Sequence, residues 1–245
     1  MLKHRQLATR RPRLLLTGFT SWSTHPFAAF NPSEHVLPGL ATRARLLGYT
    51  VETRLLRVDT GVIRSTLENA YAEFLPDFAL HMGLHGLNNR INIELGAINQ
   101  VAGNFEDRQI APDAALAIDP NYPLNTLRVP VLPVDAIVLA LNQGKGNHVF
   151  NVLRSAVRFG DKFGCNYCHY LAQGLAQTHG ASALFLHLPQ DLGQRDQIPE
   201  TWQKIYTDPK RRQDFGTPMG MVLRDIQFQV GRLCRWWLKT QWRQN

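Results

Sequence analysis

The chain has 245 residues, of which 44% are hydrophobic and 19% are charged, and its formal net charge at pH 7 is +8. These values fit one globular domain with a real core, or at most two small ones, and the absence of a self-similar period argues against a repeat array. No apolar run approaches the length of a membrane span, and the basic start lacks the long apolar core of a secretory signal. We therefore expect a cytoplasmic protein without a membrane span.

Apolar runs alternate with helical stripes along the chain. The pattern predicts strands at 13–16, 50–58, 77–84, 90–99, 153–159 and 182–189, and helices at 32–47, 62–74, 134–144, 165–178 and 219–242. Residues 101–132 and 190–215 show no clear period and are expected to be irregular. Strands that alternate with helices indicate an α/β sheet covered by helices on both faces.

Basic residues gather at 3–13, 210–212 and 232–243. A basic balance is typical of proteins that bind nucleic acid or anionic membranes. No helix-turn-helix, zinc-finger or RNA-binding signature accompanies these clusters, so we expect no nucleic-acid partner. A solvated surface is the preferred interpretation. The tryptophans beside the last cluster leave docking on an anionic membrane as an alternative function without catalysis.

The stretch FGCNYCHYL contains the pattern C-x-x-C-H, formed by Cys165, Cys168 and His169. The pattern alone fits a c-type haem attachment site, half a zinc site, a redox dithiol, or one reactive cysteine beside an inert one. The chain has three cysteines and no second C-x-x-C or H-x-x-x-H, which argues against a four-ligand zinc site and a disulfide framework. Free thiols are the leading interpretation.

Three residues have the chemistry of a nucleophilic site. Cys165 lies where a turn enters a helix, and a helix N-terminus favours a thiolate, whereas Cys168 lies one turn further in and is expected to pack. His187 ends an apolar strand and could serve as acid and base, while Glu94 lies on the polar face of an alternating strand and could orient an imidazole. A buried inert thiol, a core histidine and a solvent-facing carboxylate remain the alternatives.

Several blocks resemble one family when they are taken in order. They are LLLTGFTSW with NPSE, GLHGLNNRINIELGAIN, LPVDAIV, KFGCNY, LFLHLP and TPMGMVL. In this order they resemble the motifs of the pyroglutamyl peptidase I family, also called pyrrolidone-carboxylate peptidase, over roughly residues 13–190 and 217–240. The family's catalytic residues fall on Glu94, Cys165 and His187.

The resemblance implies a three-layer α/β/α sandwich with a mixed, mostly parallel sheet and a homo-oligomer. It also implies a cysteine peptidase that needs no metal or cofactor and removes an N-terminal pyroglutamyl residue from peptides. We expect one domain over 1–245, with a basic extension at 1–12 and an irregular insertion at 190–216.

The family's lactam-binding aromatic positions fall on Phe19, Trp22 and Phe163. Two departures leave the substrate open: Trp22 replaces the usual Phe, and Asn104 replaces a family Arg, for which Arg90 or Arg108 could substitute. The alternative is a relative with the same triad that acts on another small cyclic or N-acyl amide.

Overall fold

A computed structural model of the chain describes residues 10–21, 31–85, 90–143, 152–155, 162–189 and 218–242, without the side chains of 85, 155 and 218–222. The predicted contact residue Trp22, the last residue of the helix predicted at 134–144 and the insertion predicted at 190–216 lie outside these residues. So does most of the basic extension. The single domain over 1–245 therefore stays a prediction.

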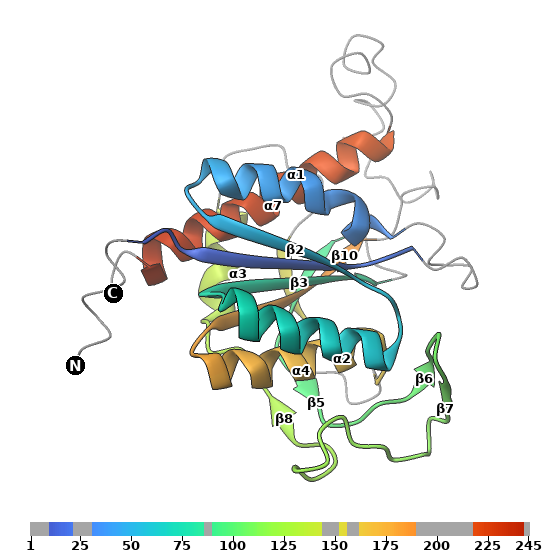
Figure 1. Cartoon of the computed structure of the whole chain (residues 1–245). Helices are drawn as coiled ribbons and strands as arrows, with labels where there is room; N and C mark the ends of the chain where they lie inside the picture. The colour runs from blue at the N-terminus through green and yellow to red at the C-terminus, as the bar shows by residue number, and fades with distance from the viewer. Residues whose placement is uncertain are drawn as a thin grey trace, which may run out of the picture.

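The centre of the molecule is a six-stranded sheet in the order β2-β1-β3-β10-β4-β9 (Figure 1). Its strands are β1 (Arg13–Phe19), β2 (Thr50–Leu56), β3 (Phe78–His85), β4 (Ile91–Glu94), β9 (Val152–Ser155) and β10 (Ser182–Pro189). All neighbouring pairs are parallel except β10 with β4, which is antiparallel. The predicted mixed, mostly parallel sheet is confirmed.

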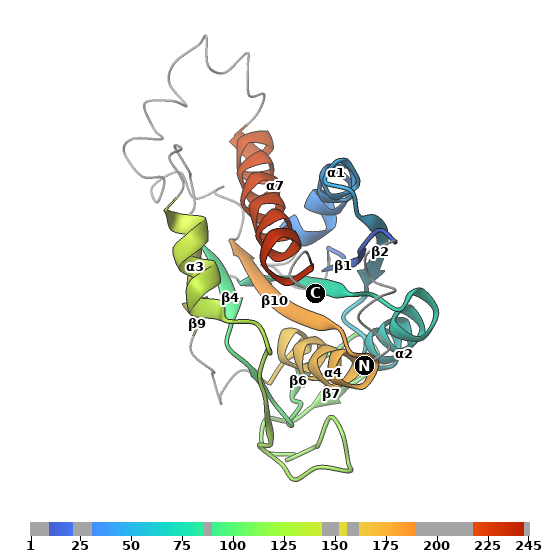
Figure 2. The same ribbon diagram turned by 90° about the vertical axis from the view of Figure 1, so that its left-hand side faces the viewer.

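Helices cover both faces of the sheet, as Figure 2 shows in the view turned by 90°. One face carries α1 (Pro32–Leu46), α3 (Val134–Asn142) and α7 (Pro218–Trp237), and the other carries α2 (Thr60–Asn69) and α4 (Gly164–His179). A π-helical turn follows α2 at Ala70–Phe74, and another follows α7 at Leu238–Trp242. The three-layer α/β/α arrangement follows from these two coverings.

Local sequence explains where α1 and α2 begin. The side chain of Asn31 accepts a hydrogen bond from the backbone N–H of Ser33 at 3.1 Å, and Pro32 occupies the first helical position. Asp59 caps α2 in the same way, accepting from the N–H of Val62 at 2.8 Å. These side chains satisfy N–H groups that have no partner within the helix.

The alternating segment 90–99 is a shorter strand than the sequence predicts. β4 ends at Glu94, and the chain then turns into β5 (Ala97–Ile98), which pairs with β8 (Leu127–Arg128) outside the main sheet. Gly96 permits the close approach of β8, because a Cβ there would lie 2.8 Å from the carbonyl oxygen of Arg128. The predicted alternation holds within β4: Ile91 and Ile93 pack in the core with α1, α3 and α7, whereas Glu94 faces the start of α4.

Two further predictions differ from the structure. Residues 101–132 contain β6 (Gly103–Asn104), β7 (Gln109–Ile110) and β8 in place of a featureless loop. The side chain of Asn99 holds much of this segment by donating to the carbonyl oxygens of Asp119, Tyr122 and Pro123. The strand predicted at 153–159 begins one residue earlier and is described only to Ser155.

The apolar stripe of α7 packs in the core. Ile226, Val230, Leu233 and Trp237 are all buried against the sheet and α1. This burial favours a closing helix over a membrane-docking one. Among the helices that the structure describes, none has the length and apolar character needed to cross a bilayer.

Candidate active site

Cys165 is the second residue of α4. The helix begins at Gly164, and its N-cap, Phe163, has extended backbone and contributes no side-chain cap. The Cys165 side chain is partly exposed, whereas the residues that follow it on α4 are mostly buried. The positive end of the helix dipole therefore lies beside a sulfur that a substrate can reach, and this field favours the thiolate.

His187 and Glu94 meet across the antiparallel pair of β10 and β4. The register places His187 opposite Asn92, and Glu94, two residues further along β4 on the same face, is its diagonal neighbour. Nδ1 of His187 lies 2.6 Å from Oε1 of Glu94, and the two residues are 5% and 8% exposed. The carboxylate accepts a hydrogen bond from the Nδ1–H group, which leaves Nε2 as the basic nitrogen. The interpretation of Glu94 as a solvent-facing residue is therefore wrong.

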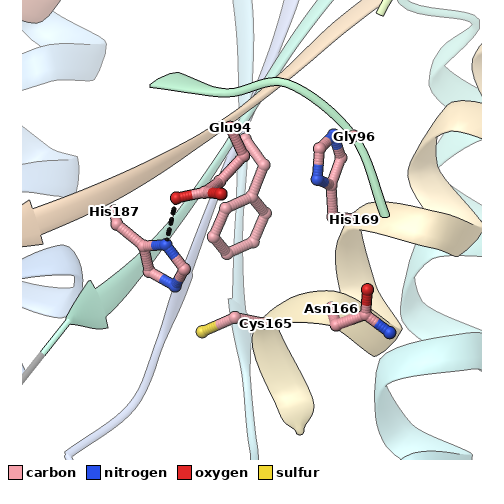
Figure 3. A pocket seen from close by; sticks show the side chains of 7 residues that line it. Glu94, Gly96, Cys165, Asn166, His169 and His187 are labelled. Carbon is pink, nitrogen blue, oxygen red and sulfur yellow. Dashed lines mark hydrogen bonds and ion pairs between the residues drawn. The ribbon is translucent and has the colours of Figure 1, made fainter. Parts of the chain in front are cut away.

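Cys165 completes this arrangement from the neighbouring layer. Figure 3 shows its sulfur on the side of the His187 ring that is turned away from Glu94, below the second ring nitrogen. All three side chains line one pocket, together with Gly96, Asn166, His169 and Phe185. The structure thus brings the three predicted residues together, while their catalytic roles stay a prediction.

Gly83 was not among the predicted site residues, and it shapes the place of the sulfur. It is the register partner of His187 in the parallel pair of β3 and β10. A Cβ at Gly83 would lie 2.7 Å from Sγ of Cys165 and 3.0 Å from Cζ of Phe185. A glycine inside an apolar strand is the signal that could have indicated such a close approach.

Asn166 is a second residue that sequence reasoning missed. Its Oδ1 accepts from the N–H of Ile98 at 2.9 Å, and its Nδ2 donates to the carbonyl oxygens of Ile98 and Gln100 at 3.0 and 2.9 Å. These bonds tie the start of α4 to the segment that follows Glu94. The Asn166 side chain therefore links the residue next to Cys165 with the segment that begins shortly after Glu94.

Phe163, predicted to contact substrate, lies half-buried at the start of α4. Its ring is 5.1 Å from that of Phe105. Gly103 has φ +116, and a Cβ there would lie 2.4 Å from Cδ2 of Phe163. The loop after β5 thus packs tightly on this ring through a glycine whose backbone other residues rarely adopt.

Phe19, the second aromatic prediction, is 3% exposed in a core cluster with Phe105 and Tyr167. It lies near the start of α4, since a Cβ on Gly164 would be 3.9 Å from its Cε1. In this position the buried ring packs beneath Gly164, the residue before Cys165. Contact with a substrate would require the side chain to be uncovered.

The arginines that could substitute at Asn104 do not reach the pocket. Arg108 donates to the hydroxyl of Thr60 and pairs with Asp107 at 3.4 Å. Arg90 and Asn104 are exposed. None of the three is among the described residues that line the pocket.

The other two cysteines of the chain are buried. Cys168 is 0% exposed, and burial raises the pKa of its thiol well above the ordinary value. Cys234 is 1% exposed, and burial raises its pKa to about 12. Within the described ranges, no group of three or more His, Cys, Asp or Glu side chains could hold a metal ion. All three cysteines are free thiols.

The fold is a three-layer α/β/α sandwich, and its pocket places a thiol at a helix N-terminus opposite a histidine that is paired with a carboxylate. This arrangement is that of a cysteine hydrolase. The chain belongs to the pyroglutamyl peptidase family, whose model matches residues 12–199.

Two similar proteins are both called pyrrolidone-carboxylate peptidase. The one from Pyrococcus furiosus is 28% identical over 181 residues, which are 72% of this chain and 80% of the relative. The one from Deinococcus radiodurans is 27% identical over 189 residues, which are 73% and 78% of the two chains.

Solved structures show the same fold. A variant of the pyrrolidone carboxyl peptidase from Pyrococcus furiosus superposes with a TM-score of 0.67 at 23% identity, covering 92% of this chain and 99% of its own. The pyroglutamyl peptidase I from Bacillus amyloliquefaciens gives 0.63 at 17% identity, covering 91% and 97%.

Proposed function

We propose that this protein is a cysteine peptidase that hydrolyses the amide bond after an N-terminal pyroglutamyl residue. The observation that carries the proposal is the His187–Glu94 pair facing Cys165 at the start of α4. Membership of the pyroglutamyl peptidase family supports the substrate class.

In the first half of the reaction, Cys165 attacks the pyroglutamyl carbonyl carbon. His187 takes the thiol proton, and Glu94 stabilises the imidazolium that forms. The carbonyl π electrons move onto oxygen, and the backbone N–H of Cys165 at the helix N-terminus is suited to stabilise this oxyanion. When the intermediate collapses, the C–N bond breaks and His187 gives its proton to the leaving amine.

In the second half, water hydrolyses the thioester. His187 is now neutral and takes a proton from the attacking water, and the carbon–sulfur bond breaks to release pyroglutamate. The imidazolium returns this proton to the departing sulfur of Cys165, which restores the thiol. The same imidazole therefore serves as base and then as acid in each half of the reaction. This role requires one fixed orientation of the ring, which the hydrogen bond to Glu94 supplies.

We further propose that aromatic side chains bind the flat lactam ring. Phe163 is the candidate that the described part of the structure favours, since it is half-buried at the start of α4. Phe19 and Trp22 remain proposed contacts. Because Asn104 and Arg108 lie away from the pocket, a related small cyclic or N-acyl amide is the second candidate substrate.

The test is release of a fluorescent amine from a pyroglutamyl amide, compared with prolyl and N-acyl amides. We expect preference for the pyroglutamyl compound and loss of turnover in Cys165→Ala. Cys234→Ala is the matched control, because that thiol is buried on α7, in the core on the opposite side of the sheet from α4. Turnover that survives Cys165→Ala would refute the proposal, and preference for another amide would support the second candidate.

A cytoplasmic location and a homo-oligomer are also proposals. The cytoplasmic location is supported by the chemistry of the site, because a nucleophilic thiol stays reduced in a reducing compartment. Inactivation by mild oxidants and recovery with a reductant would check the thiol's requirement, and a mass measurement in solution would check the second.

A further inference from the structure

The pocket that Glu94, Cys165 and His187 line contains a small cavity with a volume of about 20 Å³. A buried water needs roughly 10–15 Å³ of such space and two to four polar partners. The cavity is therefore large enough for one water molecule. Glu94, Gly96 and His169 are among the residues that line it.

His169 carries its proton on Nδ1. Nε2 of Gln173 lies 3.1 Å from the carbonyl oxygen of Ala183 and 3.1 Å from Nε2 of His169. A carbonyl oxygen only accepts, so the Gln173 atom is the amide nitrogen, and its other hydrogen points to the His169 ring. Nε2 of His169 must then be the acceptor. Burial lowers the pKa of this imidazole to about 3, so the ring is neutral with Nδ1 protonated.

The Nδ1–H donor lies at the cavity. His169 is 2% exposed, and its ring stacks on Phe185 with centroids 5.5 Å apart. Figure 3 shows one ring nitrogen of His169 on the side that faces Glu94. Among the described residues, no group accepts a hydrogen bond from Nδ1.

Glu94 presents the complementary acceptor. Its Oε1 accepts from His187, and among the described residues no group donates to Oε2. Figure 3 shows this second carboxylate oxygen on the His169 side of the pocket. A neutral donor and a charged acceptor, both more than nine-tenths buried, thus line the same small cavity.

We propose that His169 Nδ1 and Glu94 Oε2 bind one water molecule between them, and that His169 is a positioning residue for the hydrolysis. The water holds the carboxylate at its second oxygen, so the carboxylate cannot rotate away from His187. His169 touches no reacting atom and acts through Glu94. The positioning role rests on the proposed function, whereas the water site does not.

Three substitutions at residue 169 separate this role from packing. In H169N the amide nitrogen takes the place of Nδ1, whereas in H169Q the polar end takes the place of Nε2 and the donor to the cavity is lost. H169F keeps the ring that stacks on Phe185 and removes both nitrogens. A role in packing alone predicts that H169F and H169Q, which keep more of the side-chain volume, outperform H169N.

The experiment combines crystal structures of the wild type and the three variants with steady-state kinetics on a pyroglutamyl amide. We expect a water within hydrogen-bond distance of Glu94 Oε2 in the wild type and H169N, and none in H169Q or H169F. We expect kcat to fall on the order of 10- to 100-fold in H169Q and H169F with KM little changed, and to be largely retained in H169N.

Absence of the water from the wild-type structure would overturn the site, and a fully active H169Q would overturn the positioning role. The rate of Cys165 alkylation by iodoacetamide supplies a second readout that needs no substrate. It should fall in H169Q and H169F but not in H169N. Failure to hydrolyse pyroglutamyl amides would therefore count against the proposed function only. The crystal structures would still test the water site, and the alkylation rates would still test its effect on the thiol of Cys165.

Discussion

The backbone of Gly83 lies so close to the sulfur of Cys165 that a Cβ at that position would be 2.7 Å from Sγ. The contact joins β3 to the start of α4, and the neighbouring strand supplies His187 at the same register. The lack of a side chain at residue 83 therefore gives the sulfur its place beside the imidazole.

Gly83→Ala should reduce activity more than stability. The added methyl group meets the end of a short side chain, so the thiol can rotate away from His187, while Phe185 blocks relief on the other side. A displacement of about 1 Å costs roughly 100-fold in rate. Steady-state kinetics and thermal unfolding would check this. Gly61→Ala is the control, because the nearest atom to its Cβ is 3.4 Å away, and equal activities of the two variants would contradict the argument.

Glu94→Gln should lower kcat by roughly 100- to 10,000-fold. The amide keeps the size of the carboxylate, but it carries no charge to stabilise the imidazolium and can present a donor to Nδ1 of His187. Kinetics with a pyroglutamyl amide and a melting curve would separate chemistry from folding. A variant with activity close to that of the wild type would show that the carboxylate is not needed.

The triad positions could be predicted from sequence because each lies at the end of an element whose type was visible locally. The alternation of Ile91–Glu94 placed Glu94 on the face opposite Ile93, and the apolar run of β10 placed His187 at its end. The glycine inside the apolar run of β3 signals a close approach at Gly83 but does not say which residue approaches. The contacts of Asn166 and His169 could not be predicted, since they join segments that are far apart in the sequence or on different elements. Nothing near Gly83 in the sequence indicates that β10 lies beside β3.

Iodoacetamide should modify Cys165 well before Cys168 or Cys234 in the native protein. Cys165 is partly exposed at a helix N-terminus, whereas the other two thiols are buried and burial raises their pKa. Peptide mass spectrometry after timed labelling would give the order. In denaturant the three rates should converge, and early labelling of Cys168 in native protein would contradict the assigned burial.

Asn166→Ala should destabilise the protein by about 2–4 kcal/mol, because it leaves three backbone groups of the 98–100 segment without their partner. Asn166→Asp should also destabilise it, since a carboxylate cannot donate to the carbonyl oxygens of Ile98 and Gln100. Denaturant unfolding would measure both changes. Unfolding free energies equal to that of the wild type would show that the connection between α4 and β5 is not needed for folding.

The stability of the protein should fall as the pH is lowered from about 6.5 toward 3. His81 is 0% exposed between Thr17 and Tyr71, with Nδ1 2.9 Å from the Thr17 hydroxyl and Nε2 3.2 Å from that of Tyr71. Burial lowers the pKa of His81 to about 3. Because the unfolded chain binds the proton near pH 6.5 and the folded chain does not, the stabilisation is complete above pH 6.5 and is lost below it, at up to about 1.4 kcal/mol per pH unit.

His81→Leu isolates this contribution, because leucine does not titrate. The variant should be less stable at pH 8, since the hydroxyl groups of Thr17 and Tyr71 lose their partner, yet its unfolding free energy should depend less on pH between 6 and 4. Urea unfolding at a series of pH values measures the slopes. Parallel curves for His81→Leu and the wild type would show that His81 does not contribute to the acid sensitivity.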